Sequence, residues 1–387
     1  MTVDRATSQV TVLRSDKKIA TLPMTFPFHP DSAISVMNYS PPLNALHFRT
    51  LKGDEIGAEL PEFGKEFSPK NGRPVIYLDQ KDWSSLAKSI HAPEKVLPAA
   101  EREAAELLIS LARAKKVILP LSAAHMAETC KWTNDEERYR LALTIVQLSA
   151  GWQMRDPLDI RRFEIRSALV ARFKGETLDQ PANITLEPHA KHGSRRSTRP
   201  PRQRRGFSPE IELAIDALTS VQGAIDTMLD AKPVPMLPTP AWVSKFQGFT
   251  DWLAGENRTS QRKRQSIDVF FIADSMREMA QAAAEAGVSP EEMSVWLKKF
   301  SNEDITLMPS LGLFREALHQ KHLNPGTRWE NNDLTDLMYL TCAAAYADYA
   351  VGENSLVSQL EQAQKRLGRP TNVYRRLRDL VPVLEKL

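Results

Sequence analysis

The sequence predicts a mixed α/β protein with a parallel sheet that helices cover on both faces. Short apolar, β-prone runs occur at residues 75–78 and 117–119, and each is followed by a segment with helical spacing. The same alternation resumes at residue 305, after a long stretch that is almost entirely helical in pattern. Strands that alternate with helices usually form a parallel sheet buried on both faces, so we expect this architecture.

The elements follow in order along the chain. Residues 1–70 are rich in turn formers and predict an irregular or small β-rich leader. Residues 71–135 predict a strand at 75–78, helices at 83–90 and 101–114, a strand at 117–119 and a helix that Ser122 can cap. Residues 136–300 predict a helical insertion with a basic loop at 189–206. Residues 301–387 predict a strand at 305–308, helices around 313–319 and 334–345, a short strand at 349–351, and C-terminal helices.

Composition limits the class of protein but names no chemistry. The 387 residues carry 51 Lys and Arg against 48 Asp and Glu, and the net charge of +3 is too small to predict a polyanionic partner by itself. Only Cys130 and Cys342 are present, in no disulfide or zinc pattern, which favours a reducing compartment. No apolar stretch approaches the roughly 20 residues that span a bilayer. We therefore expect a soluble, cytoplasmic protein that does not enter a membrane.

Asp79 is the first candidate for chemistry, because it directly follows the predicted strand at 75–78. The carboxyl ends of strands in a parallel sheet are where ligands and catalytic groups collect. The alternative is that Asp79 only caps the following helix.

Asp333 and Asp336 stand three residues apart at the start of a predicted helix, where their side chains share one face. They could hold one divalent ion, or they could form a capping box that the helix dipole favours. Glu128 lies in the helix after the second predicted strand and could point to the same sheet edge, although a helical Glu is usually solvated. His125 on that helix is better explained as a packed or exposed residue than as a ligand.

A cluster of carboxylates without His or Cys favours Mg²⁺ or Mn²⁺ over Zn²⁺. Clustered acids repel one another unless a cation neutralises them. With a cation bound, water becomes a better nucleophile and the charge that develops on a scissile phosphate is stabilised.

Three segments together resemble the PIN-like nuclease domains. Residues 77–87 are similar to the first strand and turn of that family, and residues 119–122 with Glu128 resemble its second acidic element. Residues 332–337 and 343–351 resemble its acid-bearing helix and the strand that follows. The three segments also occur in the order found in the family.

The resemblance implies a three-layer α/β/α domain, interrupted here by the helical insertion, and a phosphodiesterase that depends on Mg²⁺ or Mn²⁺. By match, Asp79, Glu128, Asp333 and Asp336 take the catalytic, metal-binding positions. Glu353 lies where many members have an Asp, so we include it among the metal ligands, with Asp348 as a competing candidate. The resemblance says nothing about residues 1–70 or the insertion.

The basic segment 189–206 contains no acidic residue. Its arginines, together with a second basic group at the start of a later helix, could neutralise phosphates and stack on unpaired bases. The residues we expect to contact nucleic acid are Arg195, Arg196, Arg199, Arg202, Arg204, Arg205, Arg262, Lys263 and Arg264. The alternative is a solvated loop. Trp242, Phe249 and Trp252 could add stacking, but aromatic residues at helical spacing more often belong to the core.

These observations lead to two hypotheses. The first is an endoribonuclease that cleaves RNA with metal-activated water, with a toxin or defence component as one role for it. The second is a nucleic-acid-binding or regulatory protein on a PIN-like scaffold that does not cleave. A DNase is a third reading, because phosphates carry no information about the sugar. An inhibitory protein or a second copy of the chain would be a further partner.

Overall fold

The computed structural model describes residues 1–13, 16–23, 29–40, 43–60, 70–96, 98–193, 209–230, 240–324 and 326–387. The protein is a mixed α/β structure, and helix accounts for 58% of the described residues. This share is well above the roughly one third that is usual for globular proteins, as the long helical region of the sequence predicts. The chain divides into two compact units. The first unit comprises residues 1–155, 184–235 and 380–387, and the second comprises residues 156–183 and 236–379.

Most of residues 1–60 form a six-stranded antiparallel sheet in the first unit, with the strand order β3-β2-β1-β4-β5-β6. Its strands are β1 (Thr2–Asp4), β2 (Gln9–Leu13), β3 (Ile19–Pro23), β4 (Ile34–Ser40), β5 (Ala45–Thr50) and β6 (Glu55–Glu59). Burial alternates along β5, where Leu46 and Phe48 point into the core and His47 and Arg49 point outward. This period of two is the pattern of a sheet with one buried face.

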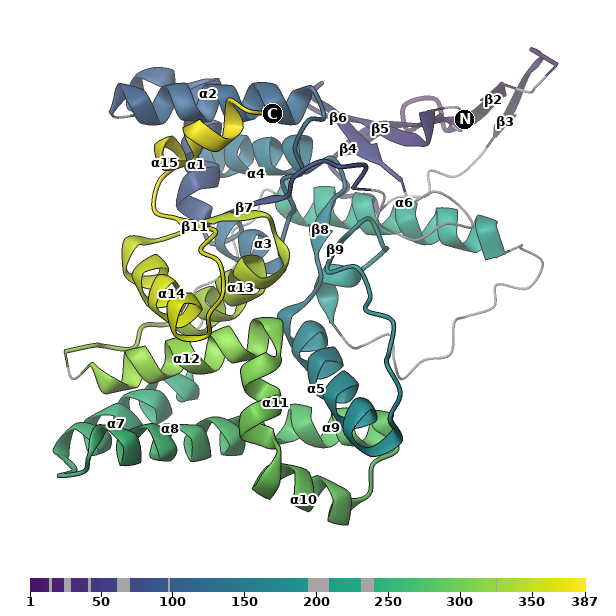
Figure 1. The fold of residues 1–387 in the computed structure, drawn as a ribbon. Helices are drawn as coiled ribbons and strands as arrows, with labels where there is room; N and C mark the ends of the chain where they lie inside the picture. The colour runs from purple at the N-terminus through teal and green to yellow at the C-terminus, as the bar shows by residue number, and fades with distance from the viewer. Residues whose placement is uncertain are drawn as a thin grey trace. The chain divides into compact units, whose positions relative to one another are not determined.

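The rest of the first unit contains the helices that pack beside this sheet. Its elements are β7 (Ile76–Leu78), α1 (Gln80–His91), η2 (Pro93–Lys95), α2 (Ala99–Arg113), α3 (Ala123–Thr129), α4 (Asp135–Ser149), β8 (Gln153–Met154), β9 (Ile184–Thr185), η3 (Ala190–His192) and α6 (Pro209–Met228). Helix α1 packs against both α2 and α4, and the three lie side by side in Figure 1. Trp83 and Leu86 of α1 are fully buried, at the spacing of one helix face.

The second unit is almost entirely helical. Its elements are α5 (Pro157–Lys174), α7 (Ala241–Gly255), α8 (Ser260–Asp274), α9 (Met276–Ala286), α10 (Pro290–Lys299), α11 (Ser301–Leu307), α12 (Pro309–Leu323), α13 (Asp333–Tyr346), β10 (Tyr349–Val351), α14 (Asn354–Arg366) and β11 (Val373–Tyr374). Helix α12 is the centre of the unit, because it packs against α5, α7, α8, α11, α13 and α14. Strands β10 and β11 pair in parallel. The last helix, α15 (Leu377–Leu384), begins in the second unit and ends in the first.

Two predicted strands differ in the structure. Residues 305–308 were expected to be a strand, but residues 305–307 are the end of α11 and Met308 is its C-cap. Ile305 is buried and Leu307 is exposed, and a short apolar run of this kind does not distinguish a strand from a buried helix turn. Residues 117–119 form no continuous strand; Ile118 and Leu121 instead make isolated parallel bridges on either side of Pro120, which has no N–H to donate.

Candidate functional site

Asp79 stands at the carboxyl end of a buried strand, as the sequence predicts. All three residues of β7 are buried, and Asp79 is the half-buried N-cap of α1. Its carboxylate accepts a hydrogen bond from the backbone N–H of Gln80 at 2.8 Å. The capping interpretation of Asp79 is therefore confirmed. It does not exclude a second role, because a carboxylate has two oxygens with about four lone-pair sites.

A buried histidine fastens α3 to the turn that carries Asp79. His125 Nδ1 accepts a hydrogen bond from the backbone N–H of Ser122 at 3.1 Å. The proton therefore lies on Nε2, which donates to the carbonyl oxygen of Leu78 at 2.7 Å. Burial lowers the pKa of His125 to about 4, so the ring is neutral at pH 7. With both nitrogens used and its ring stacked on Tyr77, His125 is a structural residue and not a ligand.

Glu128 lies on the same helix, beside the face that meets this turn. One residue further on, Thr129 Oγ1 accepts a hydrogen bond from the side-chain amide of Gln80 at 2.8 Å. At about 100° per residue, Glu128 is about 60° around α3 from His125. Glu128 is half-buried. Two hydrogen bonds, one to each neighbour of Asp79, thus hold α3 against the turn and keep Glu128 next to the bonded face.

The backbone pairing around Asp79 is parallel. The N–H of Ile76 donates to the carbonyl oxygen of Ile118 at 2.9 Å, and Val75 forms a parallel bridge with Ile118. Leu121 forms a second parallel bridge, with Gln153 of β8. Parallel segments end at the same edge of a sheet. The turn at Asp79 and the start of α3 therefore both follow the carboxyl edge of this small sheet.

The acidic start of α13 is part of the second unit. Asp333 is the first residue of the helix, and its Oδ1 lies 2.8 Å from the ammonium Nζ of Lys321 on α12. Its Oδ2 accepts a hydrogen bond from the backbone N–H of Glu330 at 2.5 Å. Asp333 is not the N-cap that the capping-box alternative requires; the N-cap is Asn332, whose side chain makes no capping hydrogen bond. Asp333 is instead held by an ammonium group and by the loop before it.

The remaining predicted acids also belong to the second unit. Asp336 is half-buried one turn along α13, and its backbone N–H donates to Asn332. Glu353 and Asp348 flank β10 and are both exposed, and Glu353 is the N-cap of α14 with no side-chain capping bond. Neither candidate for the fourth acid is therefore buried in the unit.

Asp156 is an acidic residue that the sequence reasoning missed. It is the N-cap of α5, its carboxylate accepts from the backbone N–H of Leu158 at 2.8 Å, and burial raises its pKa. Tyr339 lies one turn beyond Asp336 on α13. Burial of Tyr339 raises the pKa of its hydroxyl, and the negative charge of Asp156 raises this pKa further. Asp156 therefore lies close to the acid-bearing helix. The signal in the sequence was Asp156-Pro157, a common start of a helix.

The oxygen chemistry of these residues suits Mg²⁺ or Mn²⁺, but the described parts of the chain contain no group of three or more His, Cys, Asp or Glu side chains that could hold one ion. Asp79 and Glu128 belong to the first unit, and Asp333, Asp336 and Glu353 to the second. Within each unit the acids therefore contribute oxygen donors, not a complete coordination sphere.

The predicted basic contacts fall into two groups. Residues 195–205 lie outside the described residues. In α8, Arg262 is exposed and Lys263 is half-buried, whereas the guanidinium of Arg264 makes an ion pair with the buried carboxylate of Glu316. Arg264 is thus occupied by a structural partner in the second unit, and Arg262 is the better placed to contact a ligand.

The aromatic residues of α7 divide between core and surface. Phe249 stacks on Phe270 with ring centroids 4.1 Å apart, and Trp242 packs edge-on against Phe246. Trp252 is 43% exposed, and the guanidinium carbon of Arg258 lies 5.1 Å from its ring centroid. Phe249 and Trp242 are therefore half-buried and packed against other aromatic rings, whereas Trp252 is exposed beside Arg258.

No helix among the described residues combines the length and apolar character needed to cross a membrane. Comparison with known proteins finds no matching family model, no matching curated protein and no matching solved structure.

Proposed function

We propose that the protein is a metal-dependent endoribonuclease related in design to the PIN-like domains. The acids assigned to metal binding are those that the sequence predicts, Asp79, Glu128, Asp333 and Asp336. The observation that carries the proposal is the turn after β7, where parallel segments end at one edge with a half-buried Asp79, and α3 with Glu128 is hydrogen-bonded to that turn. Asp156 is added as a carboxylate close to α13.

The chemistry follows from the kind of side chains present. A bound Mg²⁺ or Mn²⁺ would supply Lewis-acid stabilisation of a phosphodiester and a more acidic water. The chain itself supplies carboxylate oxygens, of which Asp79 is oriented by the N–H of Gln80. His125 is neutral and fully engaged, so it orients α3 and does not transfer protons.

RNA as the substrate is supported by basic and aromatic groups in the second unit and in the basic segment. Arg262 is exposed, and Trp252 offers a ring face beside Arg258. Aromatic rings stack on unpaired bases and arginines bind phosphate, a combination suited to single-stranded RNA. DNA with unpaired bases would fit the same groups, so both substrates belong in the assay.

The test is cleavage of single-stranded RNA with Mn²⁺ by wild type and Asp79→Asn. Asn also caps helices well, so the variant keeps the fold and loses only the charge. We expect cleavage to fall at least about 100-fold while RNA binding persists. Asp4→Asn is the matched control, because Asp4 also accepts a backbone N–H, from Ala6 at 2.8 Å, and no metal role is assigned to it. Equal metal-dependent cleavage by wild type and Asp79→Asn would refute the assignment.

One observation favours the second function, a nucleic-acid-binding protein that does not cleave. Oδ1 of Asp333 already forms an ion pair with the ammonium of Lys321. A carboxylate that binds a metal ion would instead leave this oxygen open to the ion. A titration with Mn²⁺ separates the two functions, because an ion that binds the folded state raises the melting temperature. A rise that Asp79→Asn abolishes supports the nuclease. RNA binding with neither a rise nor cleavage supports the binding protein.

A further inference from the structure

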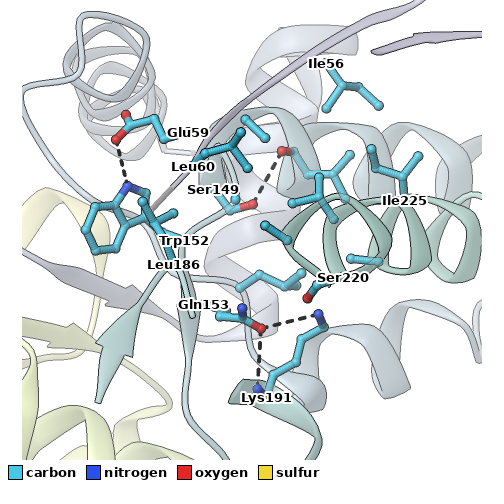
Figure 2. A pocket seen from close by; sticks show the side chains of 17 residues that line it. Ile56, Glu59, Leu60, Ser149, Trp152, Gln153, Leu186, Lys191, Ser220 and Ile225 are labelled. Carbon is cyan, nitrogen blue, oxygen red and sulfur yellow. Dashed lines mark hydrogen bonds between the residues drawn. The ribbon is translucent and has the colours of Figure 1, made fainter. Parts of the chain in front are cut away.

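A small cavity in the first unit contains a buried lysine. The cavity lies among β6, the start of β8, η3 and α6, and most of its lining is apolar, including Ile56, Trp152 and Ile225. Figure 2 shows the Lys191 side chain pointing toward Gln153 and Ser220, which line the same cavity. An ammonium group in such surroundings is unusual, because a buried charge is costly unless it is paired.

Lys191 is only 2% exposed. Its Nζ donates to Gln153 Oε1 at 3.4 Å, which is a long and weak hydrogen bond. Among the described residues no carboxylate forms an ion pair with it, and the neighbouring segment 194–206 contains no acidic residue. An ammonium has three N–H donors, so this bond leaves most of its hydrogen-bonding capacity unused.

The acidic residue that lines the cavity, Glu59, already has other partners. Glu59 accepts two hydrogen bonds from the guanidinium of Arg73, each at 2.9 Å, and one from the indole N–H of Trp152 at 3.2 Å. Arg73 and these bonds keep the pKa of Glu59 below its usual value although burial alone would raise it. Glu59 therefore balances Arg73 and Lys115, and it forms no ion pair with Lys191.

Two polar side chains in the cavity wall, Gln153 and Ser220, are held by hydrogen bonds of their own. The side-chain amide of Gln153 donates to the carbonyl oxygen of Glu187, which fixes its Oε1 toward Lys191. Ser220 Oγ accepts a hydrogen bond from the backbone N–H of His189 at 2.9 Å, which leaves its own hydroxyl proton to donate elsewhere. The Lys191 ammonium and the Ser220 hydroxyl are therefore two donors available to one acceptor.

The size of the cavity limits what that acceptor can be. Its volume is about 30 Å³, above the roughly 10–15 Å³ that a cavity needs to hold one water-sized group. A halide ion fits this space, and the phosphodiester of an RNA chain is a much larger group.

We infer that this cavity is a binding site for one small monovalent anion of halide size, held by the Lys191 ammonium and the Ser220 hydroxyl. The anion supplies the negative charge that no described carboxylate provides beside Lys191. This site is independent of the nuclease proposal, because it lies in a cavity that contains none of the acids assigned to metal binding.

The first experiment measures thermal unfolding of the full chain in sodium bromide and in sodium gluconate at equal ionic strength. Gluconate is too large for the cavity, so the comparison separates binding from screening. We expect bromide to raise the melting temperature of wild type by about 2 °C or more. The difference should vanish in Lys191→Met and shrink in Ser220→Ala. Lys95→Met, which removes an exposed lysine paired with Glu137 in the same unit, should keep it.

The second experiment is a crystal of wild-type protein grown with bromide, and it does not depend on how the variants fold. We expect an anomalous peak within hydrogen-bond distance of Lys191 Nζ. A peak absent from that position, or the same melting temperature of wild type in bromide and in gluconate, would overturn the inference. A bromide effect that Lys191→Met retains would overturn it as well, because the ion would then bind elsewhere.

Discussion

Replacing Lys191 by methionine is expected to stabilise the protein at pH 7 in a halide-free buffer. Burial lowers the pKa of Lys191 from 10.5 to about 8. Each pKa unit corresponds to 1.36 kcal/mol, so burying the charged ammonium costs about 3 kcal/mol. Methionine has a similar length and no charge, and the bond to Gln153 that it loses contributes about 1 kcal/mol. The expected net gain in the free energy of unfolding is about 2 kcal/mol.

The pH dependence gives the sign of the effect. Below pH 8 the lysine is charged in both the folded and the unfolded protein, and the full cost of burial is present. Between pH 8 and 10.5 the folded protein has released the proton that the unfolded chain still binds, so stability rises with pH in wild type. At pH 10 the remaining cost is under about 1 kcal/mol. The advantage of Lys191→Met should therefore disappear between pH 7 and pH 10.

Urea unfolding of both proteins at pH 7 and pH 10, in gluconate buffer, measures this difference. Comparing the variant with wild type at each pH removes the contributions of all other titrating groups. A variant no more stable than wild type at pH 7 would refute the reasoning, as would a difference that is the same at both pH values.

Three further predictions concern buried polar groups and packing. His125 is neutral in the folded protein, with a pKa near 4 against 6.5 in the unfolded chain. The free energy of unfolding should therefore fall by about 3 kcal/mol as the pH drops from 6.5 through 4. Urea unfolding in which stability falls no more steeply with decreasing pH in wild type than in His125→Gln would contradict this. Glu164 accepts hydrogen bonds from the first turn of α12 and from Tyr346, so Glu164→Ala should lose about 3 kcal/mol and Glu164→Gln less, and equal losses in urea unfolding would argue against a role of the charge. A Cβ on Gly312 would lie 2.8 Å from the carbonyl oxygen of Ile305, so Gly312→Ala should lower the free energy of unfolding by about 1–3 kcal/mol. An unchanged melting temperature would contradict this, because it would mean that α11 moves away without a loss of stability.

The local elements with strong periodicity could be predicted from the sequence. The buried run ending at Asp79, the helix after it, the helix that begins at Asp333 and the strand at 349–351 all occur within a few residues of their expected bounds. Each combines an unambiguous apolar pattern with a start or stop signal, such as the Asp79 cap.

The parts that could not be predicted depend on partners distant in the sequence. Residues 2–59 contain turn formers at short intervals, yet they build a sheet of six strands because each strand is completed by its neighbours. Lys191 looked like one basic residue of a solvated loop, and only the packing of β6, β8 and α6 around it buries its charge. The ion pair of Arg264 with Glu316 depends in the same way on a residue 52 positions further along the chain. Such pairings leave no local pattern.

The division of the chain into two units has a consequence for its synthesis. The path passes from one unit to the other after residues 155, 183, 235 and 379. Neither unit is a continuous stretch, so no single proteolytic cut releases either of them intact. The first unit also lacks residues 380–387, with the buried side chains of Leu380 and Leu384, until translation has passed them. Its final packing therefore follows the synthesis of the whole second unit, and the usual order in which an N-terminal domain matures first on the ribosome does not apply.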